Sequence, residues 1–274
     1  MKNLNTYINE GLVDWGDDKA INKKLSKQTT KTTVKNEIIE WIQSNTQDRI
    51  YKNKFKFDFN TTPITINYEK CIRFTTTASS LTSDIFQWGE VGGNFICSFC
   101  YSLTSLEGAP KVVGGDFECT KCQSLTSLEG APEKVGGGFK CNNCGELKTL
   151  KGAPKEVLYF ECRWCDSLIS FEGAPEKVED FFSRSNNNSL TSLKGAPKEI
   201  GYSFGCSYCQ SLKSLKYSPE KVGGNFHCSH CHNLTSLEYA PKEVGGGFYC
   251  SDCKMQFTKD DVKKVSNVEG EIRC

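Results

Sequence analysis

Cysteine pairs are the first residues in this chain whose types and spacing could do chemistry. Seven C-x-x-C pairs follow one another, beginning at Cys97, Cys119, Cys141, Cys162, Cys206, Cys228 and Cys250. Thiolates from two such pairs can hold a zinc ion tetrahedrally. The first two pairs would supply Cys97, Cys100, Cys119 and Cys122. Zinc binding is therefore one hypothesis for the cysteines.

A second interpretation of the cysteines needs no metal. The eight repeat units that carry the pairs or their replacement follow one another every 22 residues, once 21, so the thiols can be periodic for packing reasons alone. An odd number of pairs cannot be shared two by two, and one degenerate unit carries Arg184 and Asn187 instead. A buried free Cys behaves as a small hydrophobe, and its thiol can cap loop backbone groups as Asn does. This structural cysteine ladder is favoured, with no cofactor, and Arg184 predicts a local distortion.

All three histidines lie in one unit, at His227, His230 and His232. Together with a free thiol they could bind a transition metal. On a strand, however, His227 and Cys228 point to opposite sides, so surface histidines are favoured. The chain has no phosphate-binding glycine loop, nucleophile elbow or H-E-x-x-H motif. We therefore expect a protein that is not an enzyme.

The element that must position these side chains is a tandem repeat over residues 91–257. Its first unit reads VGGNFICSFCYSLTSLEGAP, and its second reads VGGDFECTKCQSLTSLEGAP. In each unit Phe and the first Cys lie two residues apart, so both point inward from a strand. Gly-Gly and Gly-Ala-Pro mark the bends. A fixed period of this size predicts a repeat solenoid of short parallel β-strands and turns, whose units bury their apolar faces against one another.

The apolar positions of the repeat suggest a family. Phe95, Cys97, Cys100, Leu103 and Leu106 match the leucine-rich pattern, with Phe and Cys in the strand positions. The repeat resembles bacterial and phage leucine-rich repeats, especially the short bacterial surface-protein type with S-L-T-S-L before a proline turn. This resemblance implies a curved solenoid with a parallel sheet on one face, usually used to bind other proteins. It implies no catalytic residue.

Charge alternates along one edge of the repeat. The two residues after each turn proline are mostly Lys and Glu, in an order that reverses from one unit to the next. Stacked strands lie about 4.8 Å apart, so each Lys is expected to face a Glu in the neighbouring coil. We interpret this alternation as a device that fixes register.

Outward-facing positions vary between units, whereas the inward positions repeat. The variable positions after the core Phe and before the second Cys carry the large or charged residues that protein interfaces favour. The candidate binding face consists of Phe99, Lys121, Arg163, Trp164, Tyr208, His230 and Tyr249. The alternative is scattered surface aromatics that fill gaps between their neighbours.

The segments that flank the repeat are predicted to cap it. Residues 1–31 read as a polar tail. Residues 32–90 contain a helix over 33–44 with Thr33 as its N-cap, a hairpin with its turn at 61–63, and a first coil that begins near Cys71. Residues 258–274 contain a helical turn over 259–265 and a final strand. The expected fold is a leucine-rich-repeat-like solenoid with a small α/β N-terminal cap.

Composition limits the kinds of partner. The net charge is +1 and 24% of residues are charged, so no global field favours nucleic acid or a membrane. No segment resembles a signal peptide or a membrane span. We expect a cytoplasmic protein, or a virion protein if phage-encoded, with its cysteines as thiols.

The predicted function is a non-enzymatic scaffold whose sheet face binds another protein. One alternative is a structural or packaged cargo component of a phage particle, because MKNLNTYINEGL loosely resembles short N-terminal peptides on proteins of large tailed phages. The other alternative is a zinc-binding repeat protein that uses the C-x-x-C pairs.

Overall fold

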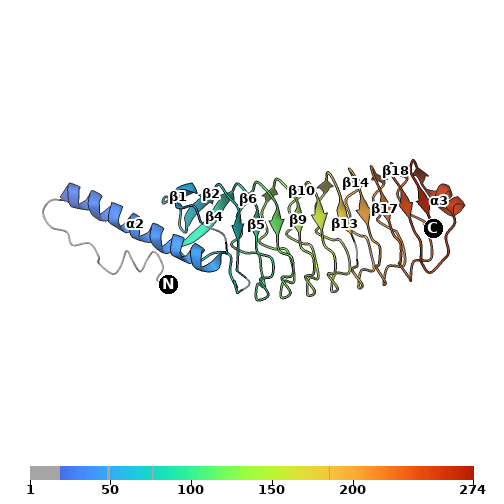
Figure 1. Cartoon of the computed structure of the whole chain (residues 1–274), viewed down its shortest axis with the longest axis horizontal. Coiled ribbons are helices and arrows are strands. Elements are labelled where there is room, and N and C mark those ends of the chain that lie inside the picture. Colours follow the sequence, from blue (N-terminus) through green and yellow to red (C-terminus); the bar gives the residue numbers. More distant parts are fainter. Residues whose placement is uncertain (1–18, 48–49, 76, 185) are drawn as a thin grey trace.

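Stacked coils form a parallel β-solenoid with a long helix at its N-terminal end (Figure 1). This computed structural model describes residues 19–47, 50–75, 77–184 and 186–274, and of residues 19–29 and 183–184 it describes the backbone alone. Successive strands lie side by side along the long axis of the molecule, and the chain advances by one coil in about every 22 residues. The predicted repeat solenoid is confirmed.

One strand of each repeat coil begins at the repeated phenylalanine. These strands form a ten-stranded parallel sheet in which phenylalanine lies beside phenylalanine. The first cysteine follows the strand and is not part of it, so the strands are shorter than predicted. The members are β3 (Ile72–Arg73), β5 (Phe95–Ile96), β7 (Phe117–Glu118), β9 (Phe139–Lys140), β11 (Phe160–Glu161), β13 (Phe182–Arg184), β15 (Phe204–Gly205), β17 (Phe226–His227), β19 (Phe248–Tyr249) and β21 (Ile272–Arg273).

A second strand precedes each bend, and the sequence did not reveal it. These strands lie in two sheets, of which one ends at β8 and the other begins at β10. The break falls at the short coil, where two residues instead of three separate Val157 from Phe160. The strands are β4 (Phe86–Val91), β6 (Val112–Val113), β8 (Lys134–Val135), β10 (Glu156–Val157), β12 (Lys177–Val178), β14 (Glu199–Ile200), β16 (Lys221–Val222), β18 (Glu243–Val244) and β20 (Asn267–Val268).

The alternating lysines and glutamates lie in register on these second strands, as predicted. Lys221 is paired with Glu243, and their side chains approach to 3.0 Å. Glu156 and Lys177 are likewise in register, at 4.0 Å. All four side chains are more than half exposed, so each pair contributes about 0–1 kcal/mol. The alternation therefore favours one register more than it adds stability.

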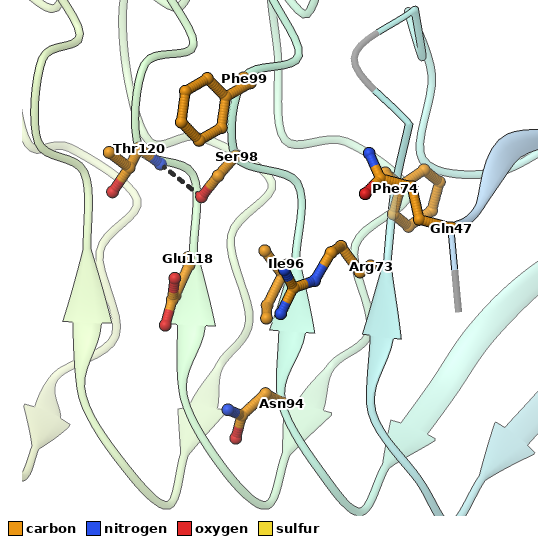
Figure 2. Close-up of a pocket in the computed structure, with 9 residues that line it drawn as sticks. All are labelled: Gln47, Arg73, Phe74, Asn94, Ile96, Ser98, Phe99, Glu118 and Thr120. Atoms are coloured by element: carbon orange, nitrogen blue, oxygen red, sulfur yellow. Dashed lines mark hydrogen bonds between the residues drawn. The ribbon is translucent and has the colours of Figure 1, made fainter. Parts of the chain in front are cut away.

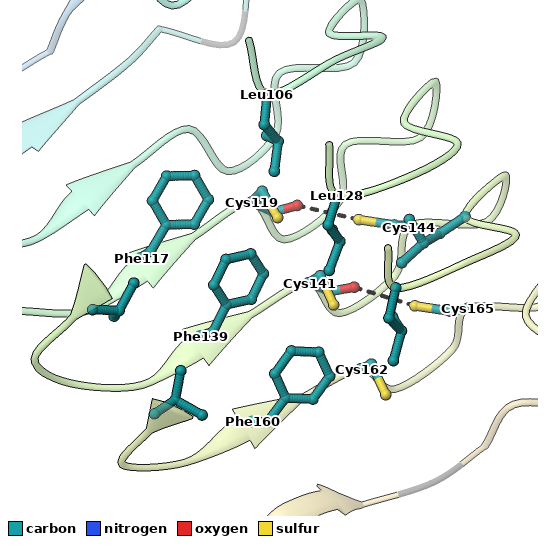
Figure 3. Packing of buried hydrophobic residues seen from close by; sticks show 14 of the residues in the cluster. Leu106, Phe117, Cys119, Leu128, Phe139, Cys141, Cys144, Phe160, Cys162 and Cys165 are labelled. Atoms are coloured by element: carbon teal, nitrogen blue, oxygen red, sulfur yellow. Dashed lines mark hydrogen bonds between the residues drawn. The ribbon is translucent and has the colours of Figure 1, made fainter. Parts of the chain in front are cut away.

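Each coil contributes the same layer of side chains to the core. Phe139, Cys141, Cys144, Leu147 and Leu150 each expose 0% of their surface. Figure 3 shows the same positions stacked in neighbouring coils. The phenylalanine rings form a continuous stack with centroids 5.0–5.8 Å apart. A single coil cannot bury its own apolar side chains, so the coils depend on their neighbours for stability.

The N-terminal cap contains helix α2 (Lys19–Asn45), the 3-10 turn η1 (Lys52–Lys54) and strands β1 (Phe55–Asp58) and β2 (Ile64–Tyr68). The two strands pair antiparallel, which confirms the predicted hairpin. On its other side β2 pairs in parallel with β4. Trp41 of the helix packs edge-on against Phe86, with ring centroids 5.2 Å apart. The cap therefore covers the first coils with aromatic side chains.

Helix α2 begins earlier than predicted. It starts at Lys19 rather than at Thr33, so Thr33 lies inside the helix and is not its N-cap, and residues 19–31 are helix rather than tail. Lys, Gln, Leu and Ala in this segment favour helix on their own, but the apolar spacing begins only where the helix meets the core. The N-terminal peptide considered as an address lies in residues 1–18, outside the described residues.

The C-terminal end confirms the predicted helical turn and final strand. Helix α3 (Lys259–Val265) starts with a capping box between Thr258 and Asp261. Strands β20 and β21 then pair in parallel with β18 and β19, and Ile272 lies beside Phe248. The chain thus completes one more coil after the last cysteine pair.

Candidate functional site

In five coils the second cysteine donates its thiol hydrogen to the backbone carbonyl of the first cysteine one coil earlier (Figure 3). In the degenerate coil Asn187 takes this place, and its Nδ2 donates to the Cys162 carbonyl at 2.8 Å. The cysteine therefore caps backbone as Asn does, as the ladder interpretation predicted. The donor–acceptor pairs at 3.1–3.2 Å are Cys122–Cys97, Cys144–Cys119, Cys165–Cys141, Cys231–Cys206 and Cys253–Cys228.

Burial opposes ionisation of two other second cysteines, Cys100 and Cys209. It raises the pKa of both thiols to about 12, whereas zinc binds the thiolate. In the described part of the chain, no three His, Cys, Asp or Glu side chains are placed to hold a metal ion. In the proposed zinc set, the Cys122 thiol points at a carbonyl. The geometry is that of a packing and capping element.

The degenerate coil is irregular, as Arg184 predicted. The pairing of β13 with β15 shifts register between Phe182 and Arg184. The side chain of Arg184 lies outside the described residues. The local distortion is therefore confirmed for the backbone.

We predict that Asn187 is a large local contributor to stability. It is fully buried, and its Oδ1 accepts from the Cys165 N–H while its Nδ2 donates to the Cys162 carbonyl, both at 2.8 Å. Asn187→Leu would leave both backbone groups unpaired in a dry core, and we expect a loss of about 2–5 kcal/mol in the free energy of unfolding. Asn187→Cys, which installs the residue of the other coils, should lose much less. Urea unfolding of both variants checks this, and equal losses would contradict it.

The residue before the second cysteine has left-handed backbone in all eight coils, with φ between 54° and 70°. The sequence had suggested that this residue lies on the strand. In the structure it lies in a turn after the strand, because strand pairing mostly ends one residue after the phenylalanine. We call these eight residues the left-handed column. They are Phe99, Lys121, Asn143, Trp164, Asn186, Tyr208, His230 and Asp252.

Large aromatic residues are unusual in this conformation. Left-handed backbone costs a non-glycine residue roughly 1–2 kcal/mol, and Asn and Asp tolerate it best. The neighbouring coil holds the turns in place, since the N–H groups of Phe99 and Tyr208 donate to its carbonyls at 2.7 and 2.9 Å. Phe99, Trp164 and Tyr208 expose 40%, 45% and 45% of their surface. The column therefore presents aromatic side chains to solvent from a strained backbone.

Neighbours along the column support some of these rings. Lys121 Nζ lies 4.8 Å from the centre of the Phe99 ring, and Tyr208 stacks on His230 at 4.3 Å. Within the described residues, Trp164 makes no ring or cation contact. Contacts with neighbouring side chains therefore account for the first two pairs, whereas the Trp164 ring has no such ring or cation partner among the described residues.

The other two predicted site residues lie beside the column. Arg163 precedes Trp164, and its Nη2 is 3.6 Å from a carboxylate oxygen of Glu161. Tyr249 is on β19 and stacks on His227, with centroids 4.6 Å apart. The predicted residues thus lie in a row near the C-terminal ends of the strands of the ten-stranded sheet, over many coils. They do not gather in one pocket.

A hollow of about 370 Å³ lies on the outer face of this sheet near its N-terminal end. Figure 2 shows Arg73 and Ile96 beside one another on adjacent strands, with Phe99 and Glu118 also lining the hollow. The sequence analysis missed Arg73 because it precedes the recognisable repeat. Its position two residues after Cys71, in register with Ile96, was the available signal.

A polar cluster on the same face was also missed. The Tyr159 hydroxyl donates to Asp116 at 2.7 Å, and Lys140 Nζ lies 2.9 Å from Glu118. Burial opposes ionisation of Asp116, but hydrogen bonds from Gly138 and Tyr159 and the charge of Lys140 outweigh it and lower its pKa. Burial and the bond to Asp116 raise the pKa of Tyr159 to about 12. The cluster is an internally paired surface network.

Comparisons with protein-family models, with curated proteins and with solved structures return no match for this chain. The described residues contain no helix with the length and apolar character needed to cross a bilayer.

Proposed function

We propose that this protein is a non-enzymatic scaffold of leucine-rich-repeat type that binds another protein along its left-handed column. The observation that carries the proposal is the exposed Trp164 ring, held at φ 54° in a position where Asn would be less strained. A strained residue whose large ring is nearly half exposed, and that contacts no other ring or cation in the described residues, is best explained by a contact outside the chain. The compartment proposed is the cytoplasm, or a virion if the protein is phage-encoded.

The geometry favours a long, shallow interface. Coils stack about 4.8 Å apart, so Trp164 and Tyr208, two coils apart, are separated by roughly 10 Å. Tyr and Trp are the side chains that most often dominate binding energy. Because the stacked coils fix their positions, little conformational entropy is lost on binding. The hollow beside Arg73 and Phe99 would receive a side chain of the partner at one end of this surface.

Substitution to asparagine separates binding from folding. Trp164→Asn and Tyr208→Asn install the residue that the column already carries at Asn143 and Asn186. We expect stability to stay equal or to rise by up to about 1 kcal/mol, because Asn accepts left-handed backbone better. Affinity for a partner captured with the full chain should fall by at least about tenfold per ring. Calorimetric titration with the purified partner and urea unfolding measure the two effects.

Two tyrosines provide a matched control. Tyr217 and Tyr239 are 50% and 54% exposed and have φ of 71° and 67°, but they lie at a different corner of the coil. Tyr217→Asn and Tyr239→Asn should leave affinity unchanged. Loss of binding in these controls alone would move the interface to the other corner. If removal of residues 1–18 alone abolished capture, the cargo hypothesis would replace the scaffold proposal.

A further inference from the structure

The last strand of the ten-stranded sheet has an unpaired edge. In the inner coils the N–H at the phenylalanine position donates to the next coil, as at Phe226 to Gly247 (2.9 Å) and Phe248 to Glu271 (2.8 Å). Ile272 occupies this position in β21, the outermost strand of the sheet. In the described part of the chain, nothing accepts from its N–H. Its carbonyl points the same way, because both groups of one residue bond to the same neighbouring strand in a parallel ladder.

The side chains at this end are also less covered than their counterparts. Phe226 and Phe248 are fully buried, whereas Ile272 is only half-buried. Cys274 is exposed, whereas Cys228 at the same position is buried. Exposed strand edges with apolar side chains are templates for pairing with another strand. Helix α3 lies at this end of the stack (Figure 1) and contacts β21.

The opposite end of the same sheet is closed. The end of α2 and the residues after it cover this edge, since Gln47 N–H donates to the Arg73 carbonyl and Thr75 N–H to the Asn45 carbonyl, both at 2.8 Å. A head-to-tail filament would need a free edge at both ends. Only an arrangement that uses the C-terminal edge twice is compatible with this asymmetry.

Charge at the open edge is complementary to itself. Glu271 and Arg273 flank Ile272, are exposed, and lie 2.8 Å apart between Arg Nε and Glu Oε1. Antiparallel pairing of two copies about Ile272 would place Glu271 of each opposite Arg273 of the other. The two Ile272 residues would exchange both backbone hydrogen bonds, the narrow pair of an antiparallel ladder.

We propose that the protein forms a two-fold symmetric dimer in which β21 pairs antiparallel with β21 of a second copy. The dimer continues the ten-stranded sheet across the symmetry axis and leaves both left-handed columns accessible. It is closed, because each copy has one free edge. This surface is distinct from the proposed partner-binding column.

Charge reversal tests the dimer. Sedimentation velocity of the full chain should show a dimer at micromolar concentration. Glu271→Lys would place four positive charges where the two β21 strands meet, and Arg273→Glu would place four negative charges there. The dimer dissociation constant of each variant alone should therefore rise at least about tenfold. An equimolar mixture of the two variants should recover the dimer, because each edge then faces its opposite. Glu133→Lys, on the exposed side of an inner coil, should dimerise as the unaltered chain does.

Each other outcome overturns the proposal. A monomeric unaltered chain excludes the dimer. If either charge-reversal variant is still a dimer on its own, the interface lies elsewhere. If the two variants do not associate when mixed, the antiparallel register is wrong. Trp164→Asn should leave the dimer intact, so the dimer and the partner-binding proposal can fail separately.

Discussion

The free energy of unfolding should fall steeply as the pH rises above about 8.5, where thiols of an unfolded chain ionise. Burial is the main reason that the pKa is raised in eight thiols of the folded chain. The unfolded state therefore loses protons that the folded state keeps, so stability is complete below pH 8.5 and declines above it. The eight are Cys100, Cys141, Cys206, Cys209, Cys228, Cys231, Cys250 and Cys253.

The expected slope is large because the thiols act together. Each contributes about 1.4 kcal/mol per pH unit once the unfolded thiol is ionised and the folded one is not. Eight such groups give a slope of roughly 10 kcal/mol per pH unit, comparable to the whole stability of a typical domain. We therefore expect cooperative alkaline unfolding near pH 9–10, followed by circular dichroism with a reductant present.

A double substitution provides the control. Cys206→Ala with Cys228→Ala removes two fully buried thiols. This variant should be less stable at pH 7, because alanine leaves small cavities. Its pH slope should nevertheless be smaller by about 3 kcal/mol per pH unit, since two protons no longer contribute. An unchanged slope, or no loss of stability between pH 8.5 and 10, would contradict the thiol explanation.

Much of the architecture could be predicted because it depends on period. The 22-residue spacing and the repeated inward Phe predicted the strands that begin at phenylalanine, and the same pattern at Ile272 predicted the final strand. The second strand of each coil could not be predicted in this way. It has only two residues, as in Lys134–Val135, and alternation needs about four to be recognised.

The candidate site was predicted by position but not by conformation. The outward location of Phe99 and Trp164 followed from variability between units, whereas their left-handed turn did not. Aromatic residues rarely adopt that conformation, so their presence at this position did not indicate a left-handed turn. The signal was at the same position in other coils, where Asn143, Asn186 and Asp252 are residues that tolerate positive φ.

Phe160 should be the most sensitive single position in the phenylalanine stack. Its ring lies between those of Phe139 and Phe182, at 5.7 and 5.4 Å, and its surface is fully buried. Phe160→Ala opens a cavity on both sides, and we expect a loss of about 3–5 kcal/mol in the free energy of unfolding. Phe160→Leu keeps most of the volume and should lose about 1–2 kcal/mol.

The same coil should also decide whether the solenoid unfolds as one unit. The second sheet is already interrupted there, between β8 and β10, so the phenylalanine stack carries more of the contact between the two halves. In a stack whose stability is a sum of neighbouring contacts, weakening one interface uncouples the repeats on either side. In a Trp164→Asn background, which leaves tryptophan only at Trp15, Trp41 and Trp88, Phe160→Ala should therefore separate the urea transition seen by tryptophan fluorescence from that seen by circular dichroism. Coincident transitions in this variant would show that the ten-stranded sheet alone keeps the halves coupled.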